Sequence, residues 1–144
     1  MSHLDTLAAM RAQIREKDYT GALRLGRSEL ERGRDSSELL VLMATAGLLG
    51  DGEQCTIDEV REWLERAVKL DPHSVDAQLE LGHFLDAVAD EPQLAIPVFK
   101  GALEKSIDFL ETALDGLDST AELQDQETKE DIKALRERAS KLLG

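Results

Sequence analysis

Apolar residues recur along most of the chain at spacings of three and four, which is the period of an α-helix that buries one face. Short polar stretches interrupt this pattern and divide it into about seven helical segments. Aromatic residues make up only 3% of the chain, so strand-favouring signals are weak. The expected fold class is all-α, with helices near residues 3–17, 18–33, 35–50, 56–71, 74–88 and 92–117 and a last helix before the C-terminus.

Local signals place several helix ends. Thr56 and Glu59 have the spacing of a capping box at the start of the fourth segment, and Asp35 is expected to cap the third. The fourth segment is expected to bury a stripe from Ile57 to Val68. Pro97 removes a backbone donor close to the start of the sixth segment, which predicts a kink or a delayed helix start.

Three stretches carry a resemblance to a known family. "EWLERAVKLDP" is similar to the second helix of a tetratricopeptide repeat (TPR), and "VDAQLELGHFL" resembles the first helix of the next repeat, with Leu81 and Gly82 in place of the family's Leu-Gly pair. "DYTGAL" resembles the entry to a second helix. The resemblance implies an α-solenoid of stacked antiparallel helix pairs in one domain over residues 1–144. Its degenerate repeats would cover about 3–36, 37–73 and 74–107, followed by a C-terminal extension and capping helix at 108–144.

Repeats of this family bind proteins or peptides in a concave groove formed by the first helix of each pair. The resemblance therefore implies a protein–protein interaction module or adaptor without chemistry of its own. Carried over by position, the expected partner-binding residues come from the three first helices: Arg11, Ile14, Arg15, Met43, Gly47, Leu79, His83 and Asp86.

Charge adds a second hypothesis. The chain holds 30 acidic and 17 basic residues, a formal net charge of −13, and the excess lies entirely beyond residue 34. This balance disfavours nucleic acid and anionic membranes as partners. It suits a basic protein or peptide, so a dedicated chaperone or an immunity-type inhibitor that neutralises a cationic client is the alternative function.

No pattern of catalytic or ligand-binding residues emerges. The three histidines show no metal-ligand spacing, and the single cysteine, Cys55, has acidic rather than basic neighbours. No glycine-rich phosphate-binding loop is present. We therefore expect neither enzyme activity nor a cofactor, in a cytoplasmic protein that is a monomer or a weak homodimer.

Overall fold

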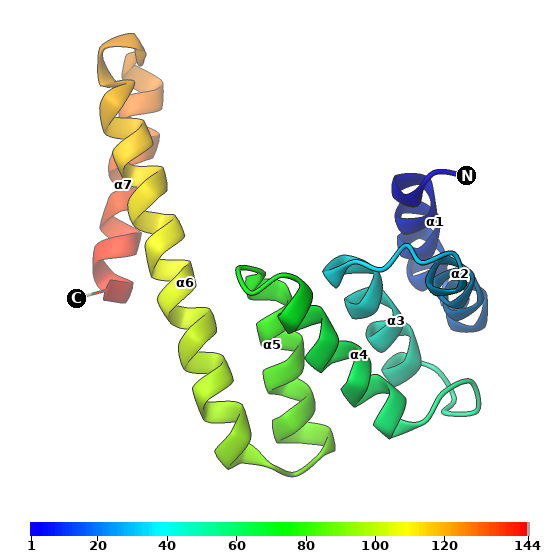
Figure 1. The fold of residues 1–144 in the computed structure, drawn as a ribbon. Coiled ribbons are helices and arrows are strands. Elements are labelled where there is room, and N and C mark those ends of the chain that lie inside the picture. The colour runs from blue at the N-terminus through cyan, green and yellow to red at the C-terminus, as the bar shows by residue number, and fades with distance from the viewer. Residues whose placement is uncertain (144) are drawn as a thin grey trace. The chain divides into compact units, whose positions relative to one another are not determined.

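The computed structural model describes residues 1–143, and the described residues contain helices and no strand, which confirms the all-α prediction. The helices are α1 (His3–Arg15), α2 (Tyr19–Glu31), α3 (Ser37–Leu49), α4 (Ile57–Leu70), α5 (Val75–His83), α6 (Pro92–Ser119) and α7 (Gln126–Leu143) (Figure 1). A π-helical turn at Phe84–Val88 continues α5, and a 3₁₀ turn at Ala121–Leu123 precedes α7. The chain forms two compact units, Met1–Ala102 and the residues from Leu103 onward.

The first unit is built from helices that pack on their neighbours along the chain. Each of α1, α2, α3 and α4 packs against the next helix, and α1 also contacts α3 while α3 contacts α5 (Figure 1). Contacts between every second helix arise when antiparallel helix pairs stack side by side. They place α1, α3 and α5 next to one another along one surface of this unit.

The core of the first unit is continuous and centred on α3. This helix is apolar on nearly all sides, and Leu39, Leu40, Met43, Ala44 and Ala46 are all buried. A helix that is apolar all round needs neighbours on several sides, which α1, α2, α4 and α5 provide. Trp63 and Leu64 of α4 and Phe84 at the π turn complete the same cluster.

The helix ends match the sequence in part. The capping box at α4 is confirmed, because Thr56 Oγ1 accepts the Glu59 N–H at 3.1 Å and Glu59 Oε2 accepts the Thr56 N–H at 2.8 Å. The prediction that Asp35 caps α3 is wrong. Ser36 occupies that position, with an extended backbone and with its Oγ accepting the Leu39 N–H at 3.1 Å. Asp35 lies one residue too early and forms an ion pair with Arg66 instead.

Two further expectations need correction. Ile57 is 53% exposed, because it is the first residue of α4 and the buried stripe begins one turn later at Val60. Pro97 does not delay its helix, since α6 already begins at Pro92. Pro97 is the sixth residue of α6, so its ring nitrogen removes the hydrogen bond that a backbone N–H at this position would donate to the Gln93 carbonyl. The predicted kink stays a prediction.

The second unit is a helical hairpin. The later half of α6 is joined to α7 by a short turn, in which the Gln124 side-chain amide donates to the Leu117 carbonyl at 2.9 Å. Asp118 near the end of α6 forms an ion pair with Arg136 of α7. This unit begins at Leu103, inside α6. The single domain over residues 1–144 and its extension from residue 108 stay predictions. That its last helix caps the stack stays a prediction.

Candidate functional site

A groove of about 410 Å³ opens where α1, α3 and the start of α5 lie next to one another. It draws residues from all three helices and from the turn before α5. The residues that line it are Arg11, Ser37, Glu38, Val41, Leu42, Asp71, Ser74 and Asp76.

The groove combines apolar and acidic groups. Val41 and Leu42 are half-buried on α3 and pack against the core. Glu38 and Asp76 belong to the first turns of α3 and α5, where the helix dipole stabilises negative charge. Arg11 is the single basic lining residue, and it forms an ion pair with Glu38. The groove therefore presents apolar side chains beneath a net negative rim.

A second hollow of about 500 Å³ continues the groove toward the N-terminus of α1. The two hollows share Ser37, Glu38 and Asp71 as lining residues. Apolar side chains from two helices, α1 and α4, extend the lining: Leu4, Leu7 and Leu70. We call the groove and this second hollow together the trough. Leu4 is 75% exposed, so the apolar part of the trough is open to a partner.

A buried carboxylate holds one wall of the trough in place. Glu29 is only 1% exposed, and its Oε2 lies 3.0 Å from Nδ1 of His3. On the other side of the ring, His3 Nε2 lies 3.1 Å from Ser36 Oγ. Glu29 can only accept, so the tautomer with the proton on Nδ1 satisfies both contacts. The hydrogen bond from His3, with the charges of two nearby arginines, holds the pKa of Glu29 below its usual value although burial acts to raise it.

The order carboxylate, imidazole and hydroxyl is also that of hydrolase triads. Here, however, Ser36 Oγ already accepts the Leu39 N–H and closes the N-terminus of α3. The nearby carboxylates of Asp35 and Glu38 line the same hollow and would oppose the negative charge that develops in acyl transfer. We assign the network a structural role, which is to tie the start of α1 to the turn between α2 and α3.

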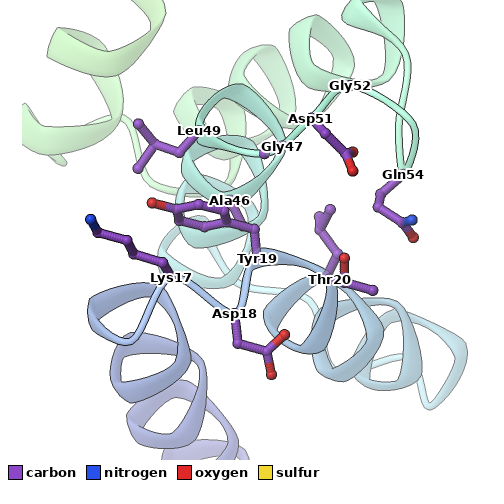
Figure 2. A pocket seen from close by; sticks show the side chains of 12 residues that line it. Lys17, Asp18, Tyr19, Thr20, Ala46, Gly47, Leu49, Asp51, Gly52 and Gln54 are labelled. Carbon is purple, nitrogen blue, oxygen red and sulfur yellow. The ribbon is translucent and has the colours of Figure 1, made fainter.

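A separate pocket of about 430 Å³ lies at the opposite ends of α1 and α3 (Figure 2). Figure 2 shows the Tyr19 ring between the side chains of Lys17 and Leu49, and Asp18 pointing away from them. Asp18 Oδ1 accepts the Gly21 N–H at 2.9 Å and so serves as the cap of α2. The charged groups of this pocket do not converge on one point, and we assign it no function.

Of the predicted binding residues, only some lie where they could contact a partner in the groove. Arg11 lines the groove, as expected from the resemblance. Met43 is fully buried, so it cannot contact a partner in this fold; it packs where Gly26 of α2 leaves room for its side chain. Gly47 faces Cys55 and Trp63 and lines the pocket of Figure 2 rather than the groove.

The other predicted residues lie outside the lining of the groove. Ile14 packs against the core, and Arg15 is exposed at the end of α1. Leu79, His83 and Asp86 are exposed on α5 and its π turn, and the His83 ring meets Phe99 edge-on at 5.1 Å between centroids. That these five residues contact a partner stays a prediction.

The sequence reading missed the acidic groove residues at the starts of α3 and α5. The groove opens at the N-terminal ends of these helices, about one turn earlier than the positions carried over from the resemblance. The available signal was the pair of acidic residues, Glu38 and Asp76, in two first turns. Neither residue is assigned a binding role from the sequence.

Comparison of the chain with known protein families, with curated proteins and with solved structures finds no match. Within residues 1–143, no helix is long and apolar enough to cross a bilayer. The same described residues contain no group of three or more histidine, cysteine or carboxylate side chains placed to hold a metal ion. The site is therefore interpreted from its geometry alone.

Proposed function

We propose that the first unit is a TPR-like interaction module that binds an extended peptide segment of a protein partner in the groove along α1, α3 and α5. The observation that carries the proposal is the shared lining of two adjacent hollows, with apolar side chains inside and carboxylates at the rim. A peptide that lies in this trough would bury one or two apolar side chains against Val41 and Leu42. Its backbone N–H groups would donate to the rim carboxylates.

The rim also defines the kind of peptide that fits. The rim carries three carboxylates, Glu38, Asp71 and Asp76, and one basic side chain, Arg11. Arg11 already forms an ion pair with Glu38. A lysine or arginine next to an apolar anchor would match this pattern, whereas an acidic peptide would be repelled. The same charge favours the second candidate function, in which the protein neutralises a cationic client. That function predicts a steep loss of affinity with salt, because charges exposed at a rim are screened.

Peptide selection followed by a matched pair of variants tests the groove. Peptides are selected from a displayed random library on the full chain, and the dissociation constants are measured by fluorescence anisotropy. Asp76→Lys places a positive charge at the rim. Asp58→Lys is its control, because Asp58 is exposed and is likewise the second residue of its helix, but does not line the groove.

We expect Asp76→Lys to weaken binding of a basic peptide about tenfold, and Asp58→Lys to leave it within twofold of wild type. Selection of peptides without basic residues, or equal effects of the two variants, would contradict the assignment of the groove.

A further inference from the structure

The helical hairpin of the second unit has almost no core of its own. Among its described residues, Ala139 is the only buried hydrophobic side chain. Several large apolar residues are at least half exposed: Leu103, Phe109, Leu123, Leu135 and Leu142. A piece of about 40 residues usually needs a metal, disulfides or a partner to be stable. An exposed apolar surface of this kind marks an interaction site.

Helical geometry places three of these exposed residues, Phe109, Leu135 and Leu142, on one face of the hairpin. Leu110 is half-buried in the part of α6 after Leu103, and Ala139 is the buried residue of α7, so these two mark the facing stripe, the side of each helix that faces the other helix. Each residue advances by about 100° around the helix axis. Phe109 on α6 is offset in one rotational sense from Leu110, and Leu142 on α7 is offset in the same sense from Ala139. Because the two helices run in opposite directions, equal senses fall on the same side of the pair.

The Asp118–Arg136 ion pair lies on the opposite side. Asp118 is offset from Leu110, and Arg136 from Ala139, in the rotational sense opposite to that of Phe109 and Leu142. The other acidic residues in the later half of α6 lie on the same side as Asp118. The hairpin therefore has one charged face, which carries the Asp118–Arg136 ion pair, and one apolar face that includes Phe109 and Leu135.

The apolar face is complementary to a copy of itself. Phe109 and Leu135 are ten and nine residues from the turn between the helices, so they lie at the same height. On α7, Asp131 lies four residues before Leu135 and Arg138 three residues after it, on the same flank. Both charges are exposed, and neither forms an ion pair within the described residues.

We propose that this face binds a second copy of the chain, so that two hairpins form a four-helix bundle. A two-fold axis at the height of Phe109 and Leu135, perpendicular to the helices, lays each helix antiparallel on its own copy. Phe109 then meets Phe109, Leu135 meets Leu135, and Asp131 of each copy meets Arg138 of the other. The face is about 25 Å long and about 20 Å wide, which gives a footprint near the lower limit for a specific interface. The dimer is weak and concentration-dependent.

Sedimentation velocity on the full chain, from about 1 µM to 1 mM, tests the proposal. The mass rises from 15.9 kDa toward twice that value as concentration increases. Phe109→Glu raises the dissociation constant at least tenfold, because it places two like charges against each other at the axis. Ile57→Glu, at a residue of equal exposure on α4, leaves it unchanged. Circular dichroism confirms that each variant keeps its helix content.

A charge exchange identifies the geometry. Arg138→Glu and Asp131→Arg each weaken the dimer about tenfold, since each replaces two attractive contacts by two repulsive ones. The double variant, with the two charges exchanged, restores the wild-type constant within about threefold. Lys133→Glu, on the other side of α7, has no effect. A chain that stays at 15.9 kDa up to 1 mM, or a double variant no better than the singles, overturns the proposal.

Discussion

Replacing Gly26 with alanine tests how closely α2 approaches its neighbours. A methyl group at this position would lie 2.5 Å from Met43 Cγ and 3.1 Å from Met10 Cε. Both methionines are fully buried, so neither side chain can move aside into solvent. Overpacking of this kind costs about 1–3 kcal/mol. Alanine also favours the helix by about 1 kcal/mol relative to glycine, and this gain opposes the cost.

Gly101→Ala separates the two effects. Gly101 also lies inside a helix, but its added methyl would meet only the Gln78 amide, at an ordinary 3.7 Å. This variant keeps the gain in helix propensity without the overpacking. The free energy of unfolding of Gly26→Ala should therefore fall below that of Gly101→Ala by about 1–3 kcal/mol.

Urea unfolding followed by tryptophan fluorescence provides the measurement. Trp63 is the only tryptophan, is 6% exposed, and belongs to the same unit as both glycines. The fluorescence therefore reports the unfolding of that unit. Equal midpoints and slopes for the two variants would refute the close contact between α2 and α3.

Three further predictions follow from burial and charge. Leu64→Ala, at a fully buried site, should lower the free energy of unfolding by about 2–5 kcal/mol, whereas Leu70→Ala, at a 46% exposed site, should change it by less than about 1 kcal/mol in the same urea assay. Glu29 has a lowered pKa in the fold, so its contribution to stability is complete above its ordinary pKa of 4.5 and is lost as the pH falls through the folded value. Thermal melts from pH 7 to pH 3 should show a shallower loss for Glu29→Gln than for wild type. Burial, and then the charge of Glu59, raise the pKa of Cys55. Because the thiolate is the reactive form, Cys55 should react with a disulfide reagent at pH 8 more slowly than free cysteine does, and its reaction should be faster in Glu59→Gln. Equal rates in wild type and Glu59→Gln would contradict this.

Helix positions could be predicted because each depends on neighbouring residues. The capping box of Thr56 and Glu59 spans four residues and forms as expected. The face that a residue occupies is a different matter on α3. There nearly every residue is apolar, so the spacing cannot distinguish Val41, which lines the groove, from Met43, which is fully buried. Only the positions of the neighbouring helices decide between them.

Two other features depend on contacts that are distant in sequence. His3 lies 26 residues from Glu29 and 33 from Ser36, and no local pattern joins these three residues. The boundary between the units falls between Ala102 and Leu103, inside a helix of 28 residues. Apart from the single Gly101, good helix formers continue through this point, so no proline, glycine pair or polar run marks the place where packing against the first unit's core ends.

The π turn at the end of α5 has a consequence for the lengths of helices that stack on one another. The Ala89 N–H bonds to the Phe84 carbonyl, five residues back, at 2.9 Å. One wider coil therefore accommodates an additional amino acid while its hydrogen bonds are kept and Phe84 stays buried. An inserted residue can be stored inside a helix in this way instead of in a loop. Neighbouring helices of unequal length can therefore stack without a gap between them. A protein of stacked helices could be lengthened by one residue at such a turn without redesign of the loops between its helices.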